Sequence, residues 1–153
     1  DGTISDSFRL GFSSTNDVLR ANGHPEASPE EYHQGTRFST PERLARHCGL
    51  KPEDGEEFLR VGALLGKQFD DSYIAKVSTS TAPLYDGVRE LIQDVAAEAK
   101  VGALSNAAVA YVRRVLSVHD LAPLFQSVHG ADDVPAPKPS GEGLLLCCAD
   151  VGE

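Results

Sequence analysis

Methionine and tryptophan are absent from the 153 residues. Because translation starts at methionine, a chain that begins with Asp1 is expected to start inside a longer reading frame, after processing, or at an engineered boundary. Apolar runs of the roughly 20 residues that a membrane-spanning helix needs are also absent, as is a secretory signal at the start. These absences predict a protein that has no membrane partner and is not secreted.

Basic residues are scarce: 14 lysines and arginines stand against 23 aspartates and glutamates, for a net charge of −9 at pH 7. A protein that binds the nucleic-acid backbone needs clustered positive charge, so nucleic acid is not expected as a partner. A small anionic substrate remains compatible with this composition, because the local field matters more than the net charge. The many carboxylates are natural ligands for Mg²⁺.

Paired metal-binding or disulfide patterns are lacking as well. The three cysteines, Cys48, Cys147 and Cys148, are odd in number and form no CxxC motif. They are expected to be free thiols in a reducing compartment, either the cytoplasm or an organelle stroma. The five histidines show no zinc-ligand spacing, so they are expected on the surface or in loops.

Helical patterns fill almost all of residues 8–80. Apolar residues recur at helical spacing over 7–22, and again from about 55 to 76. The motif Ser-Pro-Glu-Glu at 28–31 predicts a capping box with proline at the first helical position. Thr40-Pro41 predicts a second helix start of the same kind. The region is therefore expected to contain helices and no strand.

Helices and short strands alternate in the rest of the chain. Strands are predicted at 100–104 and 126–129, with helices before, between and after them. This order predicts an α/β fold, in which a parallel sheet with right-handed crossovers is covered by helices. We assign residues 1–7 and 81–153 to this sheet-containing domain and 8–80 to a separate helical domain.

Three loops are expected at one edge of the sheet. In α/β proteins ligands bind at the carboxyl ends of the strands. Ser105-Asn106 follows the first strand, and Lys138-Pro139 lies in the loop after the second. Asp1-Gly2-Thr3 would join them if a strand precedes it.

Together these loops offer what a phosphoryl group needs. Gly2 can bring backbone N–H groups to phosphate oxygens, and the amide of Asn106 at a helix N-terminus is a ready anion site. Ser105 offers a hydroxyl and Lys138 a positive charge. Asp1 is a candidate proton shuttle to the leaving group. Because phosphoryl transfer depends mostly on positioning and charge stabilisation, the set is coherent.

Each motif also has an ordinary structural explanation. Asp-Gly is a common turn, Ser105-Asn106 can be a helix N-cap, and Lys138 can be a solvated loop lysine. Gly35-Thr36-Arg37 is either a connector between helices or, through the arginine, a contact to an anionic substrate. The order of the motifs along the chain favours the phosphate site.

In that order the motifs resemble those of the haloacid dehalogenase superfamily, in the branch that contains phosphoglycolate phosphatase and β-phosphoglucomutase. The stretch Asp-Gly-Thr-Ile-Ser-Asp-Ser at 1–7 is similar to the tail of the family's first motif. Leu104-Ser105-Asn106 resembles the second motif and Lys138-Pro139 the third. Residues 83–88 resemble the return from an α-helical cap into the core.

This resemblance implies a Rossmann-like parallel sheet core with the α-helical cap inserted after the first motif. It implies that Asp1 is the general acid and base, with its backbone carbonyl as a Mg²⁺ ligand, and that Lys138 steadies the nucleophile and the transferring phosphoryl group. The phosphate-binding residues that it implies are Gly2, Thr3, Ser105, Asn106 and Lys138. From the cap, Gly35, Thr36 and Arg37 are expected to face the site.

Two parts of the family pattern fall outside the sequence. The nucleophilic aspartate would stand two residues before Asp1, and the fourth motif, with acidic Mg²⁺ ligands, would follow Glu153. The core is therefore expected to be incomplete, and the 153 residues alone are expected to be inactive and poorly stable.

The leading functional hypothesis is a Mg²⁺-dependent phosphatase that acts on a small phosphorylated metabolite such as 2-phosphoglycolate, through an aspartyl-phosphate intermediate. The alternatives are a sugar phosphomutase of the same branch and a non-catalytic binding or assembly domain of this fold. A dehalogenase is disfavoured, because the dehalogenases that the chain resembles lack an acid at the position of Asp1. A helical domain of unknown role is the remaining alternative. The patterns predict neither the substrate nor the oligomeric state.

Overall fold

The computed structural model describes residues 2–152, which belong to two compact units. One unit is Arg9–Lys76, and the other combines Asp1–Phe8 with Val77–Glu153. We refer to them as the helical unit and the α/β unit. That the helical unit is a cap over an active site stays a prediction.

The helical unit contains four α-helices and one 3₁₀ turn. These are α1 (Phe8–Ala21), α2 (Pro29–Gly35), α3 (Thr40–His47), η1 (Pro52–Asp54) and α4 (Glu56–Ala75). The predicted capping box at the start of α2 is confirmed: Ser28 Oγ accepts the Glu31 N–H, and Glu31 Oε2 accepts the Ser28 N–H at 2.7 Å. The expected start of α3 is wrong by one residue, because Ser39 is the N-cap and Thr40 is already helical.

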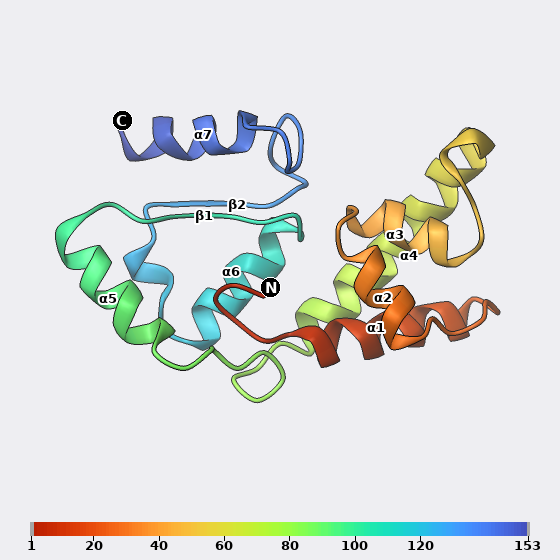
Figure 1. The fold of residues 1–153 in the computed structure, drawn as a ribbon, viewed down its shortest axis with the longest axis horizontal. Coiled ribbons are helices and arrows are strands. Elements are labelled where there is room, and N and C mark those ends of the chain that lie inside the picture. Colours follow the sequence, from red (N-terminus) through yellow and green to blue (C-terminus); the bar gives the residue numbers. More distant parts are fainter. Residues whose placement is uncertain (1, 153) are drawn as a thin grey trace. The chain divides into compact units, whose positions relative to one another are not determined.

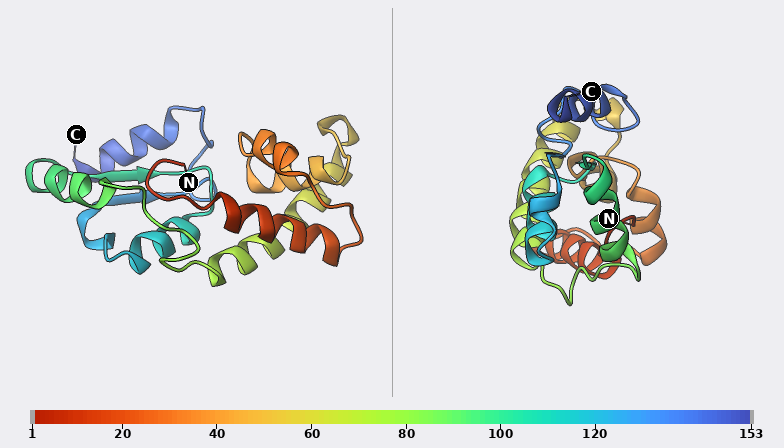
Figure 2. Two further views of the ribbon diagram at one scale, coloured as in Figure 1. Left: turned by 60° about the horizontal axis from the view of Figure 1, so that its bottom comes forward. Right: turned by 90° about the vertical axis from the view of Figure 1, so that its left-hand side faces the viewer.

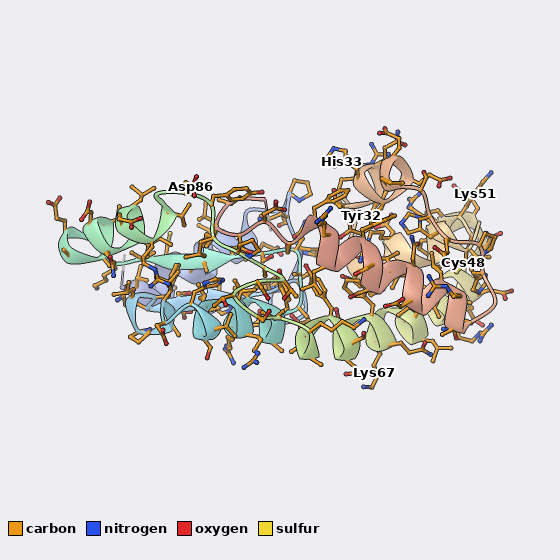
Figure 3. The ribbon with its side chains drawn as sticks, turned by 90° about the horizontal axis from the view of Figure 1, so that it is seen from below. Tyr32, His33, Cys48, Lys51, Lys67 and Asp86 are labelled. Atoms are coloured by element: carbon orange, nitrogen blue, oxygen red, sulfur yellow. The ribbon has the colours of Figure 1, made fainter. Side chains whose placement is uncertain are left out.

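Glycines on α4 let α3 pack closely against it. A Cβ on Gly62 would lie 2.6 Å from the Pro41 carbonyl oxygen, so no larger residue fits there without a shift. The side chains of Leu19, Leu44 and Leu65 are buried in this unit. Figure 3 shows Tyr32 directed into the unit, whereas Lys67 extends from α4 away from it. The apolar faces of the helices therefore form the core of this unit, as their amphipathic pattern predicts.

The α/β unit is built on two short strands and the helices around them. Its elements are α5 (Val88–Glu98), β1 (Gly102–Leu104), α6 (Val109–Val118), η2 (Ala122–Leu124), β2 (Ser127–His129) and α7 (Glu142–Val151). The strands are parallel, with Ala103 opposite Val128, which confirms the predicted α/β fold. Helix α7 lies on one face of the pair and α6 on the other (Figures 1 and 2). The core on the α6 side contains Ile92, Ala103, Leu116 and Leu121.

The N-terminal segment is anchored to this core. Ile4 packs against the core cluster, and its carbonyl oxygen accepts the Tyr85 N–H at 3.2 Å. Ser5 forms an isolated antiparallel bridge with Leu84. The Gly2-Thr3 turn is thus attached to the α/β unit and not to the helical unit.

Two expectations from composition have clear outcomes. The three cysteines are free, as predicted. His119 lies in the turn after α6, within the expectation of surface or loop histidines, but it is buried, 5% exposed, and its Nε2 lies 2.7 Å from the Ala82 carbonyl oxygen. Within residues 2–152, no helix combines the length and apolarity needed to cross a membrane.

Candidate functional site

Ser105 and Asn106 follow directly on β1, at the carboxyl ends of both strands. The Ser105 N–H donates to the His129 carbonyl oxygen at 3.1 Å, which joins this turn to the end of β2. Ser105 Oγ accepts the Ala107 N–H at 3.1 Å, so its own hydrogen remains to be donated. The turn is therefore placed by the sheet and has a hydroxyl to offer.

The predicted direct passage from this turn into a helix is wrong. Helix α6 begins only at Val109, and its first N–H donates to Asp132 Oδ1 at 2.7 Å. Ser105 and Asn106 therefore do not cap the helix. The Ser105 side chain is hydrogen-bonded within its own turn, and the first N–H of the helix is bound by Asp132, from the loop after β2. Within the described residues the backbone N–H of Asn106 donates to no acceptor.

Asn106 and Lys138 are brought together, although 32 positions separate them. Asn106 Nδ2 donates to the Lys138 carbonyl oxygen at 3.0 Å, and Asn106 Oδ1 accepts the Lys138 N–H at 2.8 Å. The Lys138 ammonium donates to the Leu104 carbonyl oxygen at 3.1 Å. The Lys138–Pro139 peptide bond is cis. An ammonium group is thus held at the carboxyl end of β1 by both its backbone and its side chain.

The loop from Gly130 to Lys138 is also fastened to the start of α6. A Cβ on Gly130 would lie 2.2 Å from the Val109 backbone nitrogen, so only glycine permits this approach. Next to it, the Ala131 N–H donates to the Ala107 carbonyl oxygen at 3.0 Å. The loop that carries Lys138 therefore runs tightly against the turn that carries Asn106.

The remaining predicted residues of the α/β unit are exposed or undescribed. Gly2 has φ 69°, and its N–H donates to the Ser5 carbonyl oxygen at 3.0 Å. Thr3 is exposed. Within residues 2–152, neither residue hydrogen-bonds to Asn106 or Lys138. Asp1 lies outside the described residues, and its predicted roles stay predictions.

The helical unit contains a pocket of about 410 Å³ whose lining includes Arg37, Arg43 and Arg46 together with Glu26 and Glu31. Two of the predicted cap residues, Gly35 and Arg37, line it, whereas Thr36 does not. The Thr36 hydroxyl donates to the His33 carbonyl oxygen at 2.7 Å at the end of α2. The pocket is bounded further by Arg43, Arg46 and His47 of α3, together with residues of the preceding loop.

Sequence reasoning missed these three α3 residues. Their i, i+3, i+4 spacing places them on one helix face, which is the signal that could have found them. Arg43 is 5% exposed; its guanidinium lies 5.0 Å from the Tyr32 ring centre and 4.7 Å from that of Phe69. Burial lowers its pKa. A cation is thus built into the wall of the pocket.

His47 and Arg46 complete the wall in different ways. His47 Nε2 is buried and has no hydrogen-bond partner among the described residues. Burial, reinforced by the Arg43 charge, lowers the pKa of the imidazole. Arg46 lies 4.1 Å from the Phe38 ring centre and pairs with Glu42 at 2.7 Å. At neutral pH the positive charges of the wall therefore come from its arginines, and the carboxylates of Glu26 and Glu31 line the same pocket.

A magnesium site is not formed by the described residues. Among residues 2–152, no group of three histidine, cysteine, aspartate or glutamate side chains could hold a metal ion. Asp132 and Asp133, in the loop that leads to Lys138, accept hydrogen bonds from the Val109 and Gly130 N–H groups. These residues therefore do not fit the expected metal.

Comparison with known proteins gives matches along the whole chain. Residues 1–152 match the model of the family described as haloacid dehalogenase-like hydrolase. A phosphoglycolate phosphatase of Caulobacter vibrioides is 35% identical over 89 residues, which are 58% of this chain and 37% of that protein. The chain thus spans well under half of the length of this curated relative.

Solved structures show the same fold at low sequence identity. CbbY from Rhodobacter sphaeroides, in complex with phosphate, aligns with a TM-score of 0.83 at 18% identity, over 100% of this chain and 70% of its own. A β-phosphoglucomutase from Clostridium difficile aligns with a TM-score of 0.72 at 16% identity, over 99% of this chain and 67% of its own.

Proposed function

Because the chain belongs to the haloacid dehalogenase-like hydrolase family, we propose that the natural protein carrying it is a phosphatase for a small phosphorylated metabolite resembling phosphoglycolate. The matched phosphoglycolate phosphatase supports this choice of substrate class. The substrate is a phosphate monoester, and the reaction releases inorganic phosphate.

The observation that carries the proposal is the pairing of Asn106 with Lys138. The Asn106 carboxamide makes two hydrogen bonds to the Lys138 backbone, at 3.0 Å to the carbonyl oxygen and 2.8 Å from the N–H. The Lys138 ammonium donates to the Leu104 carbonyl oxygen and so lies at the carboxyl end of β1. An ammonium in a fixed position stabilises the charge that develops on a transferring phosphoryl group. The exposed position of Lys138 keeps it accessible to a substrate.

Two further donors lie beside it. The Ser105 hydroxyl hydrogen and the Asn106 N–H can each bind a phosphate oxygen, since neither donates to another group in the described residues. In the proposed reaction an aspartate two residues before Asp1 attacks phosphorus, and the ester P–O bond breaks. Asp1 gives its proton to the leaving oxygen and then takes one from the water that hydrolyses the aspartyl phosphate.

Magnesium dependence is part of the proposal on the strength of the family alone. The described residues supply no metal-binding cluster, and none of the steps above is assigned to a metal. Gly2 and Thr3 are proposed as phosphate contacts from the N-terminal turn. In the helical unit, Arg37 is proposed to contact the substrate, because the arginines of its pocket suit an anionic metabolite.

Two alternatives make different predictions. A phosphomutase, suggested by the fold shared with a β-phosphoglucomutase, would move phosphate within a sugar phosphate without releasing it. A non-catalytic domain of this fold would bind phosphate and turn over no ester.

The test is an assay of the natural protein with 2-phosphoglycolate and β-glucose 1-phosphate, each with magnesium and with a chelator. We expect release of phosphate from 2-phosphoglycolate. We also expect Lys138→Ala to lower kcat on the order of 100-fold, the loss typical of one preorganised charge-stabilising group. Lys67→Ala, on the exposed side of α4 (Figure 3), is the control and keeps full activity. Formation of glucose 6-phosphate without phosphate release would establish the mutase, and phosphate binding without any turnover would establish the binding domain.

A further inference from the structure

His129 stands at the end of β2 with a carboxylate at each ring nitrogen. Its Nδ1 lies 3.1 Å from Asp133 Oδ2, and its Nε2 lies 2.7 Å from Asp150 Oδ2. The imidazole side chain is 15% exposed. Only an imidazolium has a hydrogen on both nitrogens, so both contacts are hydrogen bonds only when the ring is protonated.

These contacts connect three separate parts of the α/β unit. Asp150 belongs to α7, and its Oδ2 also accepts the Ser127 hydroxyl at 3.0 Å. Asp133 belongs to the loop that leads to Lys138, and its Oδ1 accepts the Gly130 N–H at 2.7 Å. The imidazolium therefore joins β2 to α7 on one side and to the Lys138 loop on the other.

We propose that His129 is a positioning residue for the loop that carries Lys138, which it fastens as a doubly paired imidazolium and releases when it loses a proton. A neutral ring keeps one N–H. The Asp150 contact is the shorter of the two, so the proton stays on Nε2 and the hydrogen bond to Asp133 is lost. The loop then keeps its contacts to the start of α6, through Ala131 and Asp132, and to Asn106, but loses its link to β2 through Asp133.

The electrostatic surroundings of His129 agree with this geometry. The hydrogen bond to Asp150, followed by that to Asp133, raises the pKa of the imidazole above its ordinary value. Reciprocally, the bond from His129 lowers the pKa of Asp150. Asp133 from the loop and Asp150 from α7 are the charged groups that act on the ring among the described residues, while β1 and α6, which also pack on β2, contribute none.

The direction of the pH effect follows from linkage. We call the two contacts of His129 with Asp133 and Asp150 the clamp. Since the folded protein holds this proton more tightly than the unfolded chain, the clamp contributes its full stabilisation below the ordinary histidine pKa of about 6.5. Its contribution disappears as the pH rises through the raised pKa of His129. The loop is therefore firm below the ordinary histidine pKa and becomes looser as the pH rises through the raised pKa of His129.

The experiment follows the clamp directly in the natural protein. The imidazole of His129 is titrated by NMR from pH 5 to 10, and amide hydrogen exchange of residues 130–138 is measured over the same range and corrected for intrinsic rates. We expect a pKa above about 6.5 and a fall in loop protection on the order of tenfold across that transition, the size of one charge-assisted hydrogen bond. An ordinary or lowered pKa, or loop protection that does not change with pH, overturns the proposal.

Variants separate positioning from general stability. Asp150→Asn removes one carboxylate, so the titration of His129 and the loosening of the loop should both move to lower pH, and Asp150→Glu should move them back. Asp71→Asn breaks an exposed pair with Lys67 on α4 and is the matched control, with no change in either readout. Equal shifts in Asp150→Asn and Asp71→Asn would reject the clamp.

The effect of His129 on catalysis rests on the proposed phosphatase function and is measured in a separate experiment. The alkaline limb of kcat/KM should move to lower pH in Asp150→Asn, with the acidic limb unchanged. If no ester is hydrolysed but titration and exchange behave as expected, the proposed function fails and the clamp stands. If esters are hydrolysed with an unshifted alkaline limb in Asp150→Asn, the positioning role for Lys138 is rejected.

Discussion

The carboxamide of Asn106 holds the backbone of Lys138 from both sides, with Nδ2 on the carbonyl oxygen and Oδ1 on the N–H. One side chain thus replaces the two partners that a strand neighbour would supply to an extended residue. Because the contact is to the backbone, Lys138 keeps its place when its ammonium leaves the Leu104 carbonyl oxygen to meet a ligand.

Asn106→Ala should therefore disturb Lys138 without removing it. We expect a lower kcat of the natural protein, on the order of 10- to 100-fold, because the ammonium is no longer fixed where charge develops. Loss of two hydrogen bonds should also lower the free energy of unfolding by about 1–2 kcal/mol. Steady-state kinetics and urea unfolding measure both effects.

The control for Asn106→Ala is Asn22→Ala. Asn22 also makes two side-chain hydrogen bonds, to the Val18 carbonyl oxygen and to Gln68, but in the helical unit. A similar loss of stability with unchanged kcat is expected for it. Equal kinetic losses in both variants would contradict the role of Asn106.

Gly130→Ala tests the close approach of the Lys138 loop to α6. Its Cβ would stand 2.2 Å from the Val109 nitrogen, which is backbone and cannot rotate away. We expect destabilisation of about 1–3 kcal/mol, the usual cost of an overpacked interior. Gly141→Ala, where nothing lies within 4 Å of the added carbon, should change stability little. Urea unfolding compares them, and equal stabilities would show that the loop moves freely.

Ser28 and Ser39 are the N-cap residues of α2 and α3, and they form a matched pair because only Ser28 makes a side-chain hydrogen bond. Ser28→Ala should lower the free energy of unfolding by about 1 kcal/mol, because the Glu31 N–H loses its side-chain acceptor. Ser39 holds the N-cap of α3 without a side-chain hydrogen bond, so Ser39→Ala should cost clearly less. Thermal unfolding followed by circular dichroism ranks the two, and the reverse order would contradict the assignment.

The helical unit should lose stability in acid because of His47. Burial lowers the pKa of this imidazole, so the folded state binds the proton less tightly than the unfolded chain does. The stability is complete above the ordinary pKa of about 6.5 and is lost as the pH falls through the lowered value. Urea unfolding at pH 8, 7, 6 and 5 should show this loss.

The variant His47→Leu should lack this part of the pH dependence. His33→Gln, which changes an exposed histidine of the same unit (Figure 3), should keep it. A wild-type pH profile in His47→Leu would show that the imidazole does not cause the loss.

Local patterns predicted those features whose partners are near in sequence. Ser28 and Glu31 are three positions apart, so the capping box could be identified from its letters. At the next helix the pattern Thr40-Pro41 predicted the N-cap one residue too late, because Ser39 and Thr40 are both residue types that favour this position. The parallel pairing of β1 and β2 followed from the alternation of elements.

The site was predicted in outline but not in its contacts. Sequence order placed Asn106 and Lys138 at one edge of the sheet, but no pattern predicts a carboxamide that bonds the backbone of a residue 32 positions away. Asp132 at the start of α6 was missed because a tertiary partner replaced the local cap. His129 has no motif, since its two carboxylates come from a loop and from α7.

The close contact between Gly62 and Pro41 means that substitutions at these two positions depend on each other. The Pro41 carbonyl oxygen lies 2.6 Å from the position that a Cβ on residue 62 would take, and the ring of the same proline lies 3.1 Å from the corresponding position on Gly66. A mutation that enlarges either glycine therefore pushes on the start of α3, and a compensating change must come there. In a family of such sequences, positions 41, 62 and 66 should vary as a set, and a chimera that exchanges α3 without α4 should fold poorly.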